Sequence, residues 1–158
     1  MGGPCACDGK LHFCMDNFLQ CSFTMDGVQW ISSEQYFQAA KFEDPNWRER
    51  IRREHDGEQC WRLGQSREHK LTPKWEAIKV DVMYQANLAK FAQNEDLRRG
   101  LLATQGPIKA FGFPFWVKWN PVILERIREE LRDAADRNEP RLQALVQQME
   151  EYSKSQVV

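Results

Sequence analysis

The sequence has no long hydrophobic run and almost no net charge. None of its 158 residues belongs to a stretch approaching the roughly 18 consecutive apolar residues that a membrane-spanning helix needs. Its 22 basic and 23 acidic side chains give a formal charge of −1, so it lacks the basic excess of proteins that coat nucleic acid. A pocket for one nucleotide remains compatible with this balance. The first residues also lack the basic and apolar segments of a secretory signal. We therefore expect a cytoplasmic or nuclear protein that does not bind membranes.

Motifs for metal binding and for an activated nucleophile are missing as well. Four of the five cysteines fall within the first 21 residues, but no two have Cys-x-x-Cys spacing, and His12 lies outside the usual ligand spacing. The odd number of cysteines is typical of free thiols. The three histidines are isolated, and none has a nearby Ser or Cys arrangement that suggests a nucleophile–base pair; there is also no Gly-rich phosphate loop. We therefore expect neither a metal nor a cofactor.

The remaining composition is that of one globular domain. An apolar share of 42% supports a real core, and the length leaves little room for two domains. The first residues are small and polar, so we expect a flexible arm over residues 1–12 and a single domain over residues 13–158. Within that domain, alternating apolar residues flank Asp26-Gly27, a pair typical of a tight hairpin turn. One small antiparallel β-ribbon is therefore expected.

Helix signals dominate after the ribbon. Ser32 and Gln35 have the spacing of a capping box, and Asn94 also suits the residue that precedes a helix. Proline near the first helical position marks further beginnings, because its fixed φ angle suits that position. These further signals are Asp44-Pro45, Thr72-Pro73, Asn120-Pro121 and Pro140. The sequence therefore predicts a mainly α, multihelical domain with one small ribbon, and this domain includes a C-terminal helix.

Three polar residues share one face of the first predicted helix. Glu34, Gln38 and Lys41 are spaced i, i+4 and i+7, with the aromatic residues Tyr36 and Phe37 beside them. A carboxylate, an amide and an ammonium on one face can close around a polar ligand. Glu34 lies in the first turn, where the helix dipole favours an ionised carboxylate, and this suits a base, a nucleophile or a cation stabiliser. The other interpretation is a solvated helix face.

Aromatic residues gather in two further places. Trp75 begins the longest predicted helix, where its ring can join the core or wall a pocket. Residues 111–119 hold five aromatic side chains, and Trp116 is one of them. This segment either packs over the core or offers a stacking surface for a flat ligand.

A longer pattern of residues surrounds these candidates. It consists of Asp16-Asn17-Phe18, Asp26-Gly27…Trp30 and Ser33-Glu34-Gln35-Tyr36-Phe37-Gln38-Ala39-x-Lys41, followed by Gly64, Lys74-Trp75, Met83, Lys90-Phe91, Asn94 and Leu101-Leu102-x-Thr104. This pattern resembles the NADAR family over about residues 13–131, and the block from Ser33 to Lys41 is its most specific part. The family contains bacterial N-glycosidases that act on riboflavin-pathway intermediates, and hydrolases that remove ADP-ribose from guanine.

The resemblance implies an NADAR-like α+β fold and cleavage of a bond between a ribose C1 and a nitrogen. It implies catalytic roles for Glu34 and Lys41, with no metal or cofactor. Together with the helix face described above, it gives the residues expected to bind substrate, which are Asn17, Tyr36, Gln38, Trp75 and Trp116. The expected ligand is ADP-ribosylated guanine, free or in nucleic acid, or a related nucleotide.

The chain departs from the family pattern after Thr104. Members usually carry acidic residues and a Gly-rich loop there, whereas Pro107–Asn120 is short, aromatic and free of carboxylates. A shortened loop widens the mouth of the pocket, which favours an enzyme that removes ADP-ribose from guanine. The alternatives are an N-glycosidase for phosphoribosylamino riboflavin intermediates, a binding module that holds ADP-ribose without catalysis, and a helical protein that docks a partner on its C-terminal helix.

Overall fold

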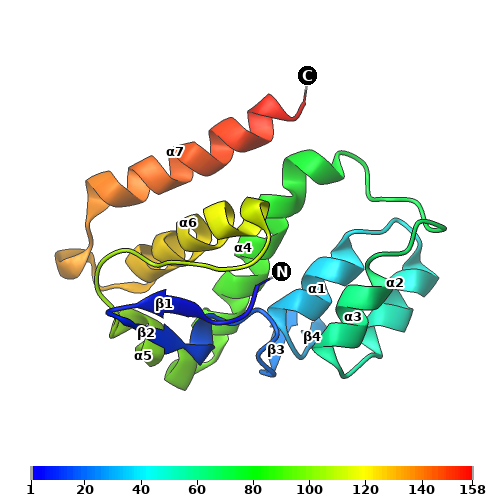
Figure 1. The fold of residues 1–158 in the computed structure, drawn as a ribbon, viewed down its shortest axis with the longest axis horizontal. Coiled ribbons are helices and arrows are strands. Elements are labelled where there is room, and N and C mark those ends of the chain that lie inside the picture. Colours follow the sequence, from blue (N-terminus) through cyan, green and yellow to red (C-terminus); the bar gives the residue numbers. More distant parts are fainter. Residues whose placement is uncertain (1, 158) are drawn as a thin grey trace.

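Helices make up most of residues 2–157, the part of the chain that this computed structural model describes (Figure 1). They are, in chain order, α1 (Ser33–Ala40), α2 (Pro45–Arg52), α3 (Gly57–Leu63), α4 (Trp75–Gln93), α5 (Glu95–Leu102), α6 (Pro114–Leu131) and α7 (Glu139–Ser155). The strands and 3₁₀ turns are β1 (Cys5–Cys7), β2 (Lys10–His12), η1 (Phe13–Met15), β3 (Phe23–Met25), β4 (Val28–Trp30) and η2 (Ala134–Asp136). β1 pairs with β2, and β3 with β4, as two separate antiparallel ribbons. The predicted mainly α fold is confirmed, with one ribbon more than expected.

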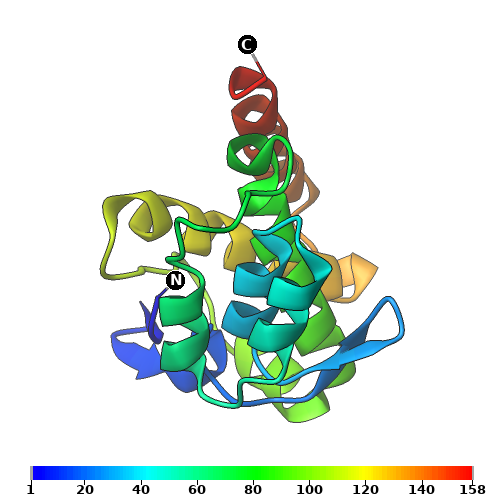
Figure 2. The ribbon, with the colours of Figure 1, turned by 90° about the vertical axis from the view of Figure 1, so that its right-hand side faces the viewer.

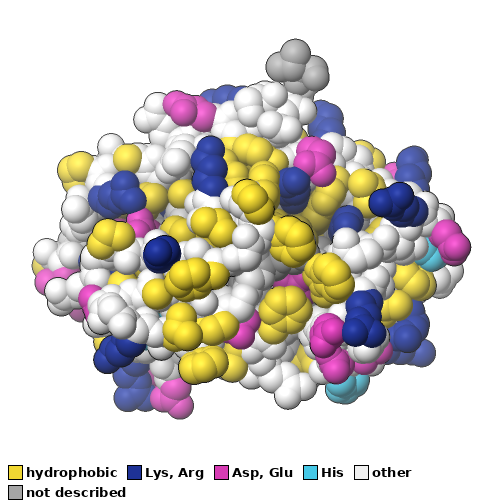
Figure 3. Space-filling model, viewed as in Figure 1, with side chains coloured by type: hydrophobic (Ala, Val, Ile, Leu, Met, Phe, Trp, Pro, Cys, Tyr) yellow, Lys and Arg dark blue, Asp and Glu magenta, His cyan; other side chains and the backbone are white. Residues whose placement is uncertain are grey.

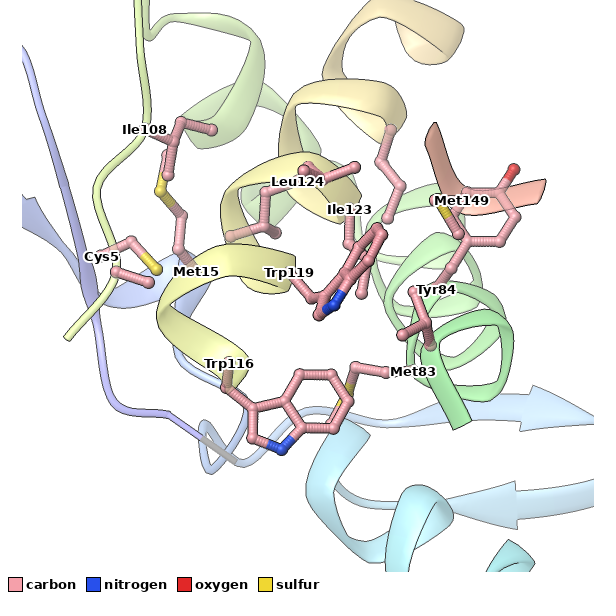
Figure 4. Close-up of a cluster of buried hydrophobic side chains, with 14 of the residues drawn as sticks. Cys5, Met15, Met83, Tyr84, Ile108, Trp116, Trp119, Ile123, Leu124 and Met149 are labelled. Atoms are coloured by element: carbon pink, nitrogen blue, oxygen red, sulfur yellow. The ribbon is translucent and has the colours of Figure 1, made fainter. Parts of the chain in front are cut away.

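The larger hydrophobic cluster lies where α4, α6 and α7 pack together. Figure 4 shows Trp116 and Trp119 projecting from α6 toward Met83 of α4. Large buried rings of this kind contribute much of the stability of a core. α7 covers the cluster with Leu145 and Met149, which are both buried. The apolar stripe of the C-terminal helix therefore docks on its own domain.

A smaller cluster joins the β3–β4 ribbon to α2 and α3. Its buried members include Phe23, Phe42, Ile51 and Cys60. α1 packs between the two clusters, and six of its eight residues are buried. A helix covered on both sides can hold its polar side chains away from water, and this position sets up the site described below.

The N-terminal hairpin replaces the flexible arm expected for residues 1–12. Its turn, Asp8-Gly9, has positive φ angles of 53° and 74°, the conformation that Asp-Gly pairs adopt in tight hairpins. β1 buries two cysteine side chains in the larger cluster and pairs through Ala6 with Lys109. This ribbon is not evident from the sequence, because its strands are too short to show an alternating pattern.

α6 begins at Pro114 rather than at the predicted Asn120-Pro121. Pro114 occupies the first turn, whereas Pro121 lies inside the helix and lacks the N–H that would bond to the preceding turn. The helix nevertheless continues through this position, because Trp116, Trp119 and Ile123 form a buried stripe that spans it. Part of the aromatic segment is therefore helical core.

Candidate functional site

Glu34 lies in the first turn of α1 with an exposed fraction of 0%. Its backbone N–H donates to the carbonyl oxygen of Asn17 at 3.0 Å. The side-chain amide of Gln38, one turn further along, donates to Oε1 of the carboxylate at 2.6 Å. The interpretation of this face as a solvated surface is therefore wrong, because the carboxylate is held in place inside the protein.

Gly64, which follows α3, meets the same helix face. A Cβ atom at Gly64 would lie only 1.8 Å from Oε1 of Gln38, so the close packing of these two segments requires glycine. The carbonyl oxygen of Gly64 accepts a hydrogen bond of 2.7 Å from Nζ of Lys41. The end of α3 therefore contacts both of the residues that share a face with Glu34.

Lys41 follows the last turn of α1 and is half-buried. Burial lowers the pKa of its ammonium below the usual 10.5, and the neighbouring Lys79 adds to this shift. Glu76 and, more weakly, Glu34 act in the opposite direction on the same pKa. A lysine with a lowered pKa has a larger share of the neutral amine, which is the nucleophilic form.

A buried polar network lies beside the start of α1. Nδ2 of Asn17 donates to Oδ1 of Asn120 at 3.4 Å, and Oδ1 of Asn17 accepts from Nδ2 of Asn87 at 3.0 Å. The hydroxyl of Ser33 donates to Oδ1 of Asn87 at 3.2 Å. The predicted site residue Asn17 is therefore fixed by two elements, α4 and α6. Sequence reasoning missed Asn87, although a polar residue on the buried face of a long helix is a usable signal.

Trp75 and Trp116 both pack against Phe37 of α1. Their rings are 5.1 and 5.2 Å from the Phe37 ring, measured between centroids. Both tryptophans are almost fully buried, and Figure 4 shows Trp116 within the larger cluster. The structure therefore brings them close to α1, in core positions rather than as walls of an open pocket.

Tyr36 points away from these residues. Its ring packs edge-on against Trp30 at 5.1 Å, next to the smaller cluster. Burial raises the pKa of its hydroxyl. Two residues along a helix correspond to a rotation of about 200°, which explains why Tyr36 does not face the same side as Glu34. The structure thus does not join it to the other predicted site residues.

The start of the chain covers part of this region. The carbonyl oxygen of Gly2 accepts a hydrogen bond of 3.3 Å from the backbone N–H of Asn17. A Cβ atom at Gly2 would lie 2.7 Å from Nδ2 of Asn120. Since Glu34 and Gln38 are both buried here, a sugar can touch the carboxylate only if a covering segment moves.

Two further expectations concern metals and membranes. Within residues 2–157, no group of three or more His, Cys, Asp and Glu side chains lies close enough to hold a metal ion. The absence of metal and cofactor stays a prediction. None of the helices that the structure describes is both long and apolar enough to cross a bilayer.

Comparison with known proteins identifies relatives for most of this region. The model of the NADAR domain matches residues 7–108, which include Glu34, Lys41 and Trp75 but not Trp116. N-glycosidase YbiA of Escherichia coli is 44% identical over 88 residues, which are 56% of this chain and 55% of that protein. A riboflavin biosynthesis protein of Vibrio vulnificus is 40% identical over 93 residues, 59% of this chain and 25% of that protein.

The fold comparison agrees with these matches. The NMR structure of the Escherichia coli protein YbiA is similar with a TM-score of 0.64 and 34% sequence identity, over 75% of this chain and 77% of that chain. In the sequence alignments, the chain spans about half the length of the N-glycosidase relatives.

Proposed function

Because the chain belongs to the NADAR family, we propose that it is an N-glycosidase that hydrolyses the bond between a ribose C1 and a nucleobase nitrogen. One observation carries the proposal. The carboxylate of Glu34 is buried in the first turn of α1 and is fixed by Gln38, within the segment that matches the family. The printed names of relatives, N-glycosidase YbiA among them, support the same class of reaction.

The reaction needs a fixed negative charge near the sugar. When the C1–N bond breaks, the bonding electrons leave with the base, and positive charge develops on the ribose. The carboxylate of Glu34 stabilises this charge or orients the water that attacks C1. The water gives its hydroxyl to C1 and its proton, directly or through a relay, to the departing nitrogen. A carboxylate that is already oriented by Gln38 loses little energy to reorganisation at this step.

Lys41 has two roles open to it. Its amine can attack C1 and form a Schiff base with the opened sugar, or its ammonium can bind a hydroxyl or phosphate group. The lowered pKa supports the first role, and the hydrogen bond to Gly64 orients the amine for either role. Borohydride reduction during turnover separates them, because it converts a Schiff base into a stable adduct that mass spectrometry locates on Lys41. Recovery of unmodified protein would assign the lysine to binding.

We propose ADP-ribosylated guanine as the substrate. The aromatic segment that leads into α6 supports this choice, since Phe111 and Phe113 are largely exposed and available to a base. The second candidate substrate is a phosphoribosylamino intermediate of riboflavin synthesis, which the printed name of the Vibrio vulnificus relative, a riboflavin biosynthesis protein, favours.

One chromatographic assay tests the function and the choice of substrate together. The purified protein is incubated separately with ADP-ribosylated guanosine and with the phosphoribosylamino pyrimidine, and the released base or amine and sugar are quantified. We expect release from the guanosine substrate at the higher kcat/KM. Faster release from the pyrimidine would replace the substrate but keep the reaction. Tight ADP-ribose binding by calorimetry with no release from either compound would contradict the enzyme and identify a binding module.

A further inference from the structure

An aromatic cavity of about 310 Å³ opens near the middle of one face of the molecule. Its walls come from four parts of the chain: Gly2 and Gly3 at the start, Phe18 before the second ribbon, α3 with Trp61, and the Phe111–Phe113 segment that leads into α6. The ribbon views show the start of the chain beside these same elements (Figures 1 and 2). Figure 3 shows hydrophobic side chains gathered in the middle of this face.

α3 links the cavity to the side chain that holds Glu34. Gly57, Trp61 and Gly64 are spaced i, i+4 and i+7, so they share one face of α3 and the residue that follows it. Gly57 contacts Phe18, and Gly64 contacts Gln38. Trp61 therefore lies between a wall of the cavity and the amide that holds the Glu34 carboxylate.

The second connection runs through the backbone. Phe18 follows Asn17, whose carbonyl oxygen accepts the N–H of Glu34. Phe18 in the wall of the cavity is therefore joined to Glu34 through the backbone of Asn17.

The chemistry of the walls selects a flat, aromatic ligand. Phe111 and Phe113 leave 48% and 61% of their surface exposed, although such rings are usually buried. Aromatic side chains at a groove bind bases by stacking, because every base has a π-face. A cavity of this volume is at the lower end of ligand sites, so it holds one base and part of its sugar rather than a whole ADP-ribose.

Glu58 adds a hydrogen-bonding edge to this surface. It lines the cavity from the first turn of α3, and its carboxylate is held through Oε1 by Arg62 at 2.7 Å. An ionised carboxylate only accepts hydrogen bonds. Guanine presents adjacent N–H donors on its pairing edge, whereas adenine presents an acceptor beside its amino group. The carboxylate therefore favours guanine over adenine.

We propose that this cavity is the base subsite, which receives the guanine of the substrate by stacking on Trp61 and Phe113 and by donation from its N–H edge to Glu58. This proposal rests on the N-glycosidase function, because it assigns the cavity to the leaving base. It also accounts for exposed aromatic residues in a segment that departs from the family pattern.

Calorimetric titration with guanosine and with adenosine tests the subsite without requiring turnover. We expect guanosine to bind the wild type more tightly than adenosine. Phe113→Ala should weaken guanosine binding by about tenfold or more, since stacking on one ring contributes about 1–3 kcal/mol. Phe13→Ala is the matched control, because Phe13 is exposed to a similar extent, 65%, and does not line the cavity. Glu58→Gln should bring the affinities for the two nucleosides close together.

Several results would overturn the subsite. They are equal binding of guanosine and adenosine by the wild type, unchanged guanosine binding by Phe113→Ala, and a guanosine preference that survives in Glu58→Gln. Thermal melting followed by circular dichroism checks that the exposed substitutions leave the fold intact.

The activity assay separates failure of the subsite from failure of the proposed function. If the wild type releases guanosine from ADP-ribosylated guanosine and Phe113→Ala does so with unchanged KM and kcat, the subsite is wrong and the enzyme stands. If guanosine binds as expected but neither the wild type nor any variant cleaves the substrate, the cavity is a guanine site and the N-glycosidase proposal is wrong. Under the full proposal, Phe113→Ala raises KM and leaves kcat closer to that of the wild type.

Discussion

At the scale of single residues, the candidate site depends on Gly64, which contacts Gln38, the residue that donates to the Glu34 carboxylate. Gln38 donates to Glu34 and at the same time packs its own amide oxygen against Gly64. Any side chain at position 64 would therefore push Gln38 away from the position in which it holds the carboxylate. The contact between Gly64 and Gln38 therefore both packs α3 against α1 and orients the Glu34 carboxylate.

Gly64→Ala should lower both stability and activity. The added Cβ atom would lie 1.8 Å from Oε1 of Gln38, and relieving such an overlap typically costs about 1–3 kcal/mol of unfolding free energy. Urea denaturation measures this change, and the chromatographic assay measures the accompanying loss of base release.

Gly100→Ala provides the control for this substitution. Gly100 lies inside α5, and its added Cβ atom would approach the Cys14 sulfur no closer than 3.4 Å. Alanine in a helix is favoured over glycine by about 0.5–1 kcal/mol, so this variant should be slightly more stable with unchanged activity. Equal effects of the two substitutions would show that Gly64 has no special contact.

The sequence predicted only part of this arrangement. The helical spacing of Glu34, Gln38 and Lys41 is local, so the shared face could be found without a structure. The contact of Gln38 and Lys41 with Gly64 joins residues more than 20 positions apart, and no local rule specifies such a pair. Tyr36 was predicted to belong to the site because its neighbours in sequence do, although a residue two positions from Glu34 faces the opposite side of the helix.

At the scale of elements, α4 carries an unusual buried charge. Lys90 is fully buried, and its Nζ donates to the carbonyl oxygen of Asp16 at 2.9 Å. Burial lowers its pKa from 10.5 to about 8. Part of this lowering is offset by nearby groups that raise the pKa of Lys90, which are Cys21, Cys14, Asp16 and Cys5. The helix therefore holds a lysine at a cost in stability near neutral pH.

Lys90→Met should stabilise the protein most below about pH 8. The unfolded chain binds more protons at this lysine than the native state between about pH 8 and 10.5, so the stability of the wild type rises with pH across that window. Methionine lacks this dependence, and the advantage of the variant should shrink over the same window. The carbonyl oxygen of Asp16 still accepts from Leu19 at 3.2 Å, so the substitution leaves no unpaired acceptor there.

Chemical denaturation of both proteins between pH 6 and about 10.5 measures this difference. Burial raises the pKa of Cys5 to about 12, and Lys90 offsets part of this rise, so the comparison reports the lysine together with its coupling to the neighbouring thiols. Lys70→Met, at an exposed lysine, gives the effect of losing a surface charge. A stability difference for Lys90→Met that stays constant with pH would contradict the account.

α7 is the element that closes the larger cluster. Leu145 is fully buried, while Tyr152 packs on Trp119 at 4.9 Å and donates from its hydroxyl to the carbonyl oxygen of Glu76 at 2.7 Å. These contacts bind the helix to both α4 and α6. The structure therefore needs this helix even though it lies outside the segment that matches the family.

Leu145→Ala should cost about 2–5 kcal/mol of unfolding free energy, because it leaves a cavity in a tightly packed core. Leu142→Ala is the control on the same helix, since Leu142 is only half-buried, and its cost should be about 1 kcal/mol or less. Urea denaturation of the two variants measures both values. Similar small costs for both would mean that α7 does not cover the core in solution.

The start of a helix was predictable where the side chain of the preceding residue caps its first N–H groups. The hydroxyl of Ser32 accepts the N–H of Gln35 at 3.0 Å, and the carboxylate of Asp44 accepts that of Asn46 at 2.9 Å, at the two predicted starts. The start of α6 was wrong because burial of a tryptophan stripe outweighs the missing N–H of Pro121. Tertiary packing of this kind cannot be derived from local signals alone.

At the scale of the whole molecule, α1 connects two hydrophobic clusters. Phe37 belongs to the larger cluster, and Ala39 belongs to the smaller one. The helix that carries the candidate carboxylate thus contributes buried side chains to both clusters. Neither cluster can lose its structure without exposing one side of this helix.

The two clusters should therefore unfold together. Tryptophans lie in both, with Trp116 and Trp119 in the larger and Trp30 in the smaller. We expect urea transitions followed by tryptophan fluorescence and by far-ultraviolet circular dichroism to have the same midpoint, as in two-state unfolding. Replacing both Trp30 and Trp47, which packs against the smaller cluster, with phenylalanine removes the tryptophans of that cluster and should leave the agreement intact. Two separate transitions would mean that α1 does not couple the clusters.

The most direct test of the account is the rate of base release by Glu34→Gln. This substitution keeps the size of the side chain and removes its charge, so we expect the rate to fall by about 100-fold or more. Guanosine binding and the melting temperature should stay close to those of the wild type. Glu95→Gln, at a first-turn glutamate of α5 whose side chain is 69% exposed, should keep full activity. Base release by Glu34→Gln at the rate of the wild type would contradict the role given to the buried carboxylate.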